Sequence, residues 1–316
     1  MNSLVIPVYR NAESLPRLLA VLGGLHRDLA GDLEVVFVVD GSPDASAAIL
    51  REQLPAQPFA SRLVLLTRNF GSFAAIRVGL EHASGERFAV MAADLQEPPE
   101  LMLEFFRVLA DDQADVVVGT RRSRGDPWLS RLFSSAFWAL YRRFVFRDIP
   151  PGGVDVFGCN AAFRAQLLAL TESRSSLVGQ LFWLGFRRTV VEYDRRVREE
   201  GRSAWGFRRK LDYLLDSLYA FSDLPVRVLL GVGVAALLAG VLIAAVAVVA
   251  RLVGYIDVPG YTPILVSVLM FGGFNALGLG IVGSYAWRAY ENTKGRPLAI
   301  VMAAAQFPGS PAEASA

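Results

Sequence analysis

The fold is decided by the stretch Arg87-Phe-Ala-Val-Met-Ala-Ala-Asp-Leu-Gln-Glu-Pro-Pro-Glu100. It joins an apolar, strand-like run to the start of a helix-like run through a Pro-Pro turn, and Asp94 lies directly after the strand. In an open α/β sheet, ligands bind just beyond the carboxyl ends of the strands. The stretch therefore predicts a polar site around Asp94 at one edge of a sheet.

The surrounding sequence alternates between two patterns. Short β-rich runs occupy residues 4–8, 33–39, 62–66, 87–91 and 115–119, and helix-like runs occupy residues 12–29, 44–54, 74–82 and 100–110. Strands that alternate with helices indicate βαβ units and a mostly parallel sheet buried on both faces. We therefore expect a Rossmann-like α/β domain.

The last third of the chain holds most of its hydrophobic excess; 53% of the whole chain is hydrophobic. Residues 228–250 and 262–286 carry no charge, and each run is long enough to span a bilayer as a helix. Arginines and lysines precede the first run and follow the second. The positive-inside rule therefore predicts a two-helix hairpin in the inner membrane, with both termini and the α/β domain in the cytoplasm.

Two further segments carry aromatic residues at helical spacing beside arginines, residues 127–147 and 205–222. Each is either a helix packed on the sheet or an interfacial helix lying in the headgroup region. Two such segments bracketing one part of the chain favour the membrane surface. The glycines of the second apolar run could pack the hairpin or support oligomers.

Composition excludes several classes of function. The net charge of +2 gives no global field that would attract nucleic acid. The single cysteine, Cys159, excludes an intramolecular disulfide and fits a reducing cytosolic setting. With His26 and His82 as the only histidines, no metal site can be built from Cys and His pairs.

Five loops carry candidate chemistry, at residues 5–11, 38–44, 68–72, 152–160 and 198–205. Pro7 and Tyr9 could hold a flat base, and Asp40 could accept a hydrogen bond from a base or a ribose. Asn69 offers donors and acceptors, and Gly71 allows close approach to a ligand. Helix capping would also explain Ser42 and Asp44 in the second loop.

The order and spacing of these loops resemble the GT-A glycosyltransferases of family 2, in the polyprenyl-phosphate branch that includes dolichyl-phosphate mannose synthase. The resemblance runs from about residue 4 to 297 and includes Asp94-Leu-Gln96 and Gly295-Arg-Pro297. It implies a GT-A core that binds a nucleotide sugar, an acceptor-side and membrane-interface segment, a transmembrane hairpin and a cytoplasmic tail. These parts would occupy residues 1–125, 126–225, 226–287 and 288–316, respectively.

The resemblance also implies roles for individual residues. The nucleotide sugar would contact Pro7, Tyr9, Asp40, Asn69, Gly71, Arg198 and Ser203. Asp94 and Gln96 would serve a divalent cation, Mg²⁺ or Mn²⁺, and the diphosphate. Asp155 would be the candidate general base near the acceptor, and Arg121 and Arg122 would receive the acceptor phosphate.

Two departures from the family pattern concern the metal. Ala92 replaces the first carboxylate of Asp-x-Asp, and Val39 replaces the first of Asp-Asp-Gly-Ser. Magnesium often binds through one or two carboxylates plus substrate phosphates, so Asp94 and Gln96 could suffice with weakened affinity. Arginines could instead neutralise the diphosphate, or the chain could have lost catalysis.

The function implied is transfer of a sugar from a nucleotide sugar, with a UDP-sugar favoured, to a polyprenyl phosphate at the cytoplasmic membrane face. Inversion at the anomeric carbon and a role in cell-envelope glycan synthesis are expected. A processive polysaccharide synthase is disfavoured, because its Gln-x-x-Arg-Trp motif does not occur. Transfer to another lipid acceptor and a non-catalytic nucleotide-sugar-binding homologue are the alternatives. The sequence leaves the sugar and the oligomeric state open.

Overall fold

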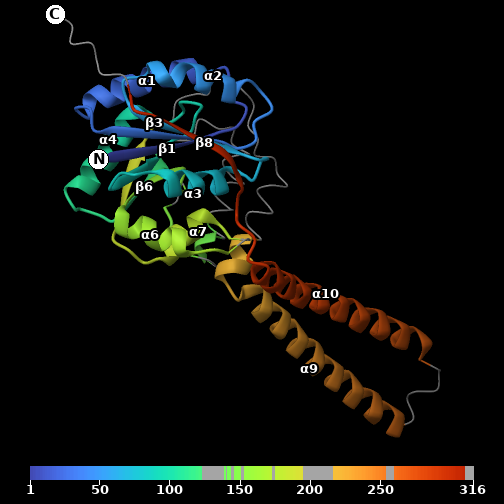
Figure 1. Ribbon diagram of the computed structural model, residues 1–316. Helices are drawn as coiled ribbons and strands as arrows, with labels where there is room; N and C mark the ends of the chain where they lie inside the picture. The colour runs from blue at the N-terminus through green and yellow to red at the C-terminus, as the bar shows by residue number, and fades with distance from the viewer. Residues whose placement is uncertain are drawn as a thin grey trace, which may run out of the picture.

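The protein consists of an α/β domain from which two long helices project side by side (Figure 1). The computed structural model describes residues 1–122, 139, 141–143, 146–150, 153–172, 175–194, 216–253 and 260–309.

The α/β domain is built on one sheet, which has eight strands within the described residues. Their order across the sheet is β7-β5-β6-β4-β1-β2-β3-β8. The strands are β1 (Asn2–Val8), β2 (Leu33–Val39), β3 (Ala60–Leu66), β4 (Arg87–Val90), β5 (Val116–Arg121), β6 (Val156–Asn160), β7 (Arg188–Tyr193) and β8 (Val301–Phe307).

Most neighbouring strands run parallel, as the alternation of strands and helices predicts. Strands β3, β2, β1 and β4 form a continuous parallel block, and β5 pairs in parallel with β7. Two strands that the sequence patterns do not reveal run the other way. Strand β6 inserts antiparallel between β4 and β5, and β8 pairs antiparallel with β3. The sheet is therefore mixed.

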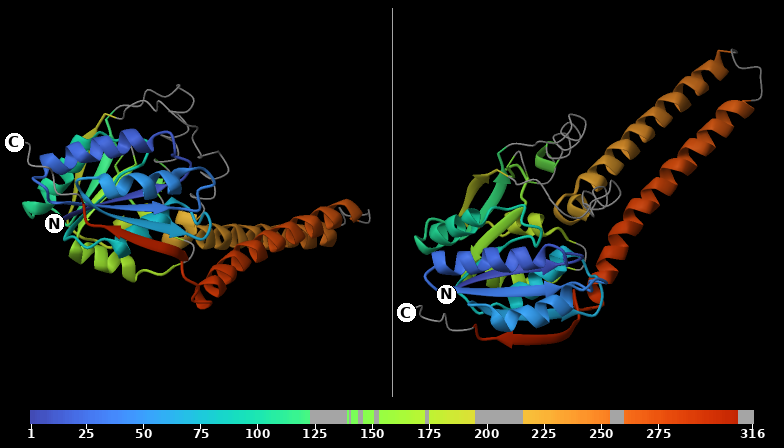
Figure 2. Two further views of the ribbon diagram at one scale, coloured as in Figure 1. Left: turned by 45° about the horizontal axis from the view of Figure 1, so that its top comes forward. Right: turned by 90° about the horizontal axis from the view of Figure 1, so that it is seen from above.

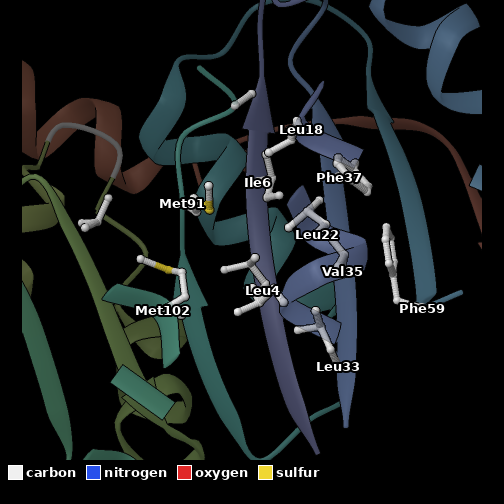
Figure 3. Packing of buried hydrophobic residues seen from close by; sticks show 14 of the residues in the cluster. Leu4, Ile6, Leu18, Leu22, Leu33, Val35, Phe37, Phe59, Met91 and Met102 are labelled. Atoms are coloured by element: carbon white, nitrogen blue, oxygen red, sulfur yellow. The ribbon is translucent and has the colours of Figure 1, made fainter. Parts of the chain in front are cut away.

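The central strands bury both faces because their side chains alternate between two apolar clusters. Leu4 and Ile6 of β1 point to one cluster, whereas Val5 points to the other. Figure 3 shows Leu4 and Ile6 on the side of the sheet where Leu18 and Leu22 of α1 pack. Period-two alternation within an unbroken apolar run is what a strand covered on both faces requires.

Helices cover both faces of the sheet (Figure 2). The first cluster includes side chains of α1, α2, η1 and α4, and the second includes α3, α6 and α7. Their bounds are α1 (Leu15–Asp28), α2 (Ser46–Gln53), η1 (Leu54–Ala56), α3 (Ser72–His82), α4 (Pro99–Ala110), α6 (Ala161–Ala169) and α7 (Leu177–Trp183). The helices predicted over residues 12–110 are thus confirmed within a few residues at each end.

The two projecting helices are α9 (Leu224–Leu252) and α10 (Tyr261–Thr293). Large apolar side chains are exposed along both, such as Leu238 and Leu279. Among the described residues, one stretch, Leu224–Ile243, is long and apolar enough to cross a membrane. The structure therefore contains both predicted helices, and α9 carries a candidate span.

Beyond α10, the chain returns to the α/β domain. The family resemblance implies a cytoplasmic tail over residues 288–316, but the structure adds β8 to the sheet beside β3, with Ser61 opposite Phe307 and Leu66 opposite Val301. The backbone N–H of Thr67 donates to the carbonyl oxygen of Ile300 at 3.0 Å, which extends this contact past the end of β3. The edge strand beside β3 thus comes from a segment that follows both long helices in the sequence.

Candidate active site

One edge of the sheet gathers the candidate site residues. Strands β1 to β5 and β7 all end at this edge, and the two antiparallel strands, β6 and β8, begin there. The predicted site residues that the structure describes lie in or directly beside these strand ends: Pro7, Tyr9, Asp40, Asn69, Gly71, Asp94, Gln96, Arg121, Arg122 and Asp155. The predicted location of the site is therefore consistent with the topology.

Each loop that follows β1 to β4 contains a residue with positive φ. These residues are Arg10 (57°), Gly41 (58°), Gly71 (99°) and Leu95 (55°). Such a conformation is uncommon for residues other than glycine and costs free energy that the surrounding structure must supply. Each of these four successive loops at one edge therefore holds one residue in the left-handed region.

Asp40 is almost fully buried, with an exposed fraction of 2%. Its Oδ1 accepts the backbone N–H of Phe70 at 2.7 Å, and its Oδ2 accepts that of Gly71 at 2.9 Å. Burial raises the pKa of Asp40, although these two donors and the charge of Arg68 oppose the rise. The carboxylate thus fixes the loop after β3, a role that the prediction of a ligand contact did not include.

The neighbouring predicted residues are more accessible. Pro7 and Tyr9 are partly exposed, and Asn69 is exposed. The side-chain amide of Asn69 donates to the backbone carbonyl of Asp40 at 3.3 Å. These side chains are therefore accessible at the sheet edge, as a contact with a nucleotide base would require.

Ser42 and Asp44 join the loop after β2 to the loop after β1. The Oγ of Ser42 accepts the backbone N–H of Arg10 at 2.8 Å, and Oδ2 of Asp44 accepts that of Ala12 at 3.0 Å. Asp44 also accepts the backbone N–H of Ser46 at 3.2 Å, close to the start of α2. The N-cap residue of α2 is Ala45, and no side chain caps this helix, so the capping explanation is wrong and the pair instead links the two loops.

The segment between β4 and α4 carries Asp94, Gln96 and a third polar residue that the sequence analysis missed. Oδ1 of Asp94 accepts the backbone N–H of Gln96 at 3.3 Å, across the left-handed Leu95. Glu97 is buried, with 3% of its surface exposed, and its Oε2 accepts the backbone N–H of Ala92 at 3.3 Å. A buried glutamate therefore stabilises the backbone at the position where the family pattern has its first aspartate.

This segment fits a divalent cation only in part. Asp94 and Gln96 offer carboxylate and amide oxygens, which hard cations prefer. No group of three or more His, Cys, Asp or Glu side chains suited to a metal occurs among the described residues. The protein would thus supply few ligands, and phosphate oxygens of a substrate would have to supply others.

A second polar group lies at the same edge and comprises Arg121, Asp155 and Tyr193, hereafter the Arg121 cluster. Nε of Arg121 donates to Oδ2 of Asp155 at 2.6 Å, and Nη2 donates to Oδ1 at 2.7 Å. The hydroxyl of Tyr193 donates to the same Oδ2 at 3.1 Å. The structure therefore brings the predicted base, Asp155, and the predicted phosphate ligand, Arg121, into one bidentate ion pair.

Arg122 differs from its neighbour. Its side chain is 63% exposed and pairs with Glu192 at 3.6 Å and Asp194 at 3.9 Å. Arg198 and Ser203, predicted to grip the donor, lie outside the described residues, as does most of each predicted interfacial helix.

Sequence reasoning missed Tyr193, Glu97, Arg10 and Arg68. The guanidinium of Arg10 lies 5.4 Å from the ring centroid of Tyr9, and that of Arg68 lies 4.1 Å from the centroid of Phe70. The sequence did contain a signal for Arg10 and Arg68, because each lies just after a strand-like run and near an aromatic residue. Tyr193 and Glu97 gave no comparable signal.

The α/β domain thus gathers its polar groups beyond the strand ends, with Asp94 on the segment that follows the central strand β4. The family model "Glycosyl transferase family 2" matches residues 3–170. The chain belongs to this family, and it is a glycosyltransferase.

Curated relatives match nearly the whole chain. An uncharacterized glycosyltransferase of Synechocystis sp. is 32% identical, over 95% of this chain and 94% of its own length. The SfII prophage-derived bactoprenol glucosyl transferase of Shigella flexneri is 30% identical, over 95% and 96%. The undecaprenyl-phosphate 4-deoxy-4-formamido-L-arabinose transferase of Proteus mirabilis is 32% identical, over 93% and 91%.

Among solved structures, the mannosyltransferase PcManGT of Pyrobaculum calidifontis, in complex with GDP-Man and Mn²⁺, is 17% identical. The match covers 90% of this chain and 87% of that one, with a TM-score of 0.46.

Proposed function

We propose that this glycosyltransferase moves a sugar from a nucleotide sugar to a polyprenyl phosphate at the cytoplasmic face of the inner membrane. The observation that carries this proposal is the extent of similarity to relatives named for bactoprenol and undecaprenyl phosphate. It covers at least 93% of this chain, so it includes the long helices as well as the α/β domain.

The loops after β1 to β3 would hold the nucleotide. Pro7 and Tyr9 would contact the base, and Asn69 and Gly71 would line the pocket. Asp40 would act mainly by fixing the backbone of residues 68–71, since both of its oxygens accept N–H groups from that loop. A uracil base is favoured by the family resemblance.

Asp94 and Gln96 would hold a divalent cation together with the donor diphosphate. When bound, the cation supplies positive charge to the leaving diphosphate. Arg10 and Arg68 lie on loops at the same edge, and their charges would add to this stabilisation. Groups aimed at the charge that develops in the transition state usually contribute the largest catalytic effect.

In the reaction, an oxygen of the acceptor phosphate attacks the anomeric carbon while the bond to the nucleoside diphosphate breaks. A phosphate is already ionised at neutral pH, with a second pKa of about 6. The reaction therefore needs positive charge near the acceptor more than it needs a strong base. The guanidinium groups of Arg121 and Arg122, at the end of β5, would bind the acceptor phosphate.

The long helices would bring the site to the lipid. Both α9 and α10 meet the α/β domain at one end and expose apolar side chains along their length (Figures 1 and 2). A polyprenyl chain stays in the bilayer, so the active site has to lie at the headgroup plane. A membrane hairpin with both of its ends in the cytoplasm would meet this requirement, and α9 carries the candidate span.

The proposal is tested with the full-length protein in detergent, polyprenyl phosphate and UDP-, GDP- and dTDP-sugars. Mass spectrometry detects glycosyl phospholipid. We expect product with one donor, loss of product on addition of EDTA, and loss in Asp94→Asn. The exposed Asp28→Asn serves as the matched control and should keep wild-type activity. If the wild-type protein forms product only with a different lipid acceptor, or with none, the proposal is wrong.

A companion experiment tests the membrane part. Residues 224–293 are replaced by a short flexible linker, so that β8 can still pair with β3. We expect the variant to leave the membrane fraction and to lose activity on long-chain acceptors. Retention in the membrane fraction would show that the hairpin is not the anchor.

A further inference from the structure

The Arg121 cluster is assembled from three strands whose positions are fixed by backbone hydrogen bonds. Arg121 at the end of β5 is the register partner of Tyr193 at the end of β7. The backbone N–H of Arg122 donates to the carbonyl oxygen of Tyr193 at 2.9 Å, and that of Asp155 donates to the carbonyl oxygen of Gly119 at 3.1 Å. The three side chains are therefore placed relative to one another by the sheet itself.

The carboxylate of Asp155 accepts three hydrogen bonds within the cluster. Two come from Arg121 in a side-on bidentate arrangement, and the third comes from Tyr193. Such charge-assisted bidentate bonds fix the plane of a guanidinium as well as its position.

Tyr193 is suited to act as a permanent donor. It is buried, with 5% of its surface exposed. Burial raises the pKa of its hydroxyl, and the negative charges of Asp155 and Glu97 raise it further, against the opposing effect of Arg121. The hydroxyl therefore keeps its proton at neutral pH and can donate to Asp155.

We propose that Asp155 and Tyr193 are positioning residues that hold the guanidinium of Arg121 in the orientation that binds the phosphate of the lipid acceptor. This inference rests on the proposed function. It gives Asp155 a different role from the general base predicted by resemblance: the carboxylate orients a cation and takes no proton from the acceptor. It also adds Tyr193 as a specific part of the acceptor site.

The chemistry favours this division of roles. The acceptor phosphate needs no base, since it is ionised at neutral pH. Protonation of Asp155 would remove its negative charge and so weaken its charge-assisted pair with Arg121. The same pair, kept intact, presents a planar cation in a fixed place at the edge of the sheet where the segment with Asp94 also lies.

The first measurement is steady-state kinetics of the full-length protein in detergent with polyprenyl phosphate. The variants are Tyr193→Phe, Asp155→Asn and Arg121→Lys, with Tyr290→Phe as the matched control on the exposed surface of α10. We expect Tyr193→Phe to raise KM for the acceptor about five- to tenfold, as loss of one hydrogen bond would. The kcat and the KM for the donor should each change less than twofold, and the pH profile should keep its shape. Arg121→Lys should raise the acceptor KM further.

Several outcomes would overturn the proposal. If Asp155→Asn lowers kcat by a hundredfold or more at unchanged acceptor KM, or removes the acidic limb of the pH profile, then Asp155 is a base. Unchanged kinetics in Tyr193→Phe would exclude a positioning role for that hydroxyl. Thermal unfolding of each variant is compared with that of Tyr290→Phe, so that a folding defect is recognised.

The second measurement is equilibrium binding of farnesyl phosphate without donor, which separates this inference from the proposed function. If the wild-type protein transfers no sugar but binds farnesyl phosphate more tightly than Arg121→Lys and Tyr193→Phe do, the positioning role stands and the proposed reaction fails. If it transfers sugar and Tyr193→Phe binds farnesyl phosphate as well as the wild type does, the positioning role fails alone.

Discussion

Asp40 and Gly71 are joined by a hydrogen bond of 2.9 Å between the buried carboxylate and the backbone N–H. The bond ties the end of β2 to the loop after β3, and a second bond from Phe70 to the other oxygen doubles the connection. The shape of the proposed nucleotide pocket thus depends on a residue that scarcely reaches its surface.

Replacement of Asp40 by alanine should destabilise the protein and weaken donor binding together. The N–H groups of Phe70 and Gly71 would lose their acceptor in a buried place, at a cost of about 2 kcal/mol or more. Asp40→Asn keeps one acceptor oxygen and should show a smaller loss. Thermal unfolding and calorimetric binding of UDP measure the two effects. Normal UDP affinity in a folded Asp40→Ala protein would contradict the coupling.

Gly41 and Gly71 should respond differently to alanine. A Cβ at Gly41 would lie 2.3 Å from the backbone carbon of Arg68, so the two loops would have to separate. A Cβ at Gly71 meets nothing within 4 Å, and only its φ of 99° opposes the change. We expect Gly71→Ala to cost about 1–3 kcal/mol of stability, and Gly41→Ala to cost more. The order of their unfolding midpoints is the test, and the reverse order would refute it.

Replacement of Ala92 by aspartate should strengthen metal binding. A second carboxylate near Asp94 would add charge and an oxygen ligand, which hard cations favour. We expect the Mn²⁺ concentration needed for half-saturation in the presence of UDP to fall about tenfold, as measured by electron paramagnetic resonance. Ala20→Asp, on the exposed surface of α1, is the control. Unchanged affinity would argue that residue 92 does not face the cation.

Removal of β8 should destabilise the α/β domain although the strand lies at the end of the chain. Truncation after Ile300 exposes the paired edge of β3, from Ser61 to Leu66. We expect a loss on the order of 2 kcal/mol, equivalent to a few degrees in Tm, and a greater tendency to aggregate. Truncation after Gly309, beyond the strand, is the matched control. Equal melting temperatures for both truncations would show that β8 adds little.

Asp115 should make stability depend on pH. Hydrogen bonds from Arg187 lower its pKa, despite some desolvation. A carboxyl whose pKa is lower in the folded state stabilises the protein above its unfolded pKa, about 4, and loses this effect as the pH falls through the folded value. Asp115→Asn should therefore be less stable by about 1 kcal/mol at pH 7, and equally stable near pH 2. A difference that persists at low pH would contradict this origin.

The sequence predicts the parallel block of the sheet because its strands are short, apolar and bounded by turn residues. The strand over residues 33–39 is found at the same positions. The pattern could not reveal β6, since Val156-Phe-Gly-Cys-Asn160 is short and contains a glycine. Nor could it reveal β8, whose alanines neither alternate nor carry strong strand propensity. Its pairing partner is β3, far away in the sequence.

The sequence predicted where the site lies, but not the hydrogen bonds and ion pairs within it. The rule that ligands lie beyond strand ends locates Asp40, Asp94 and Arg121. The rule does not predict that Asp40 is buried and bound to a neighbouring loop, or that Arg121 and Asp155 form an ion pair. Such pairs depend on the register of strands that are distant in the sequence, so only the folded chain reveals them.

The position of β8 also sets an order of events during biosynthesis. The ribosome makes β3 long before β8, because both long hydrophobic helices lie between them in the sequence. Throughout that interval the sheet has an open edge. The sheet gains β8 only after both helices have been made, so a chain that stalls within α9 or α10 would leave the edge of β3 unpaired. Cellular quality control could recognise such a chain by the unpaired edge of β3 alone.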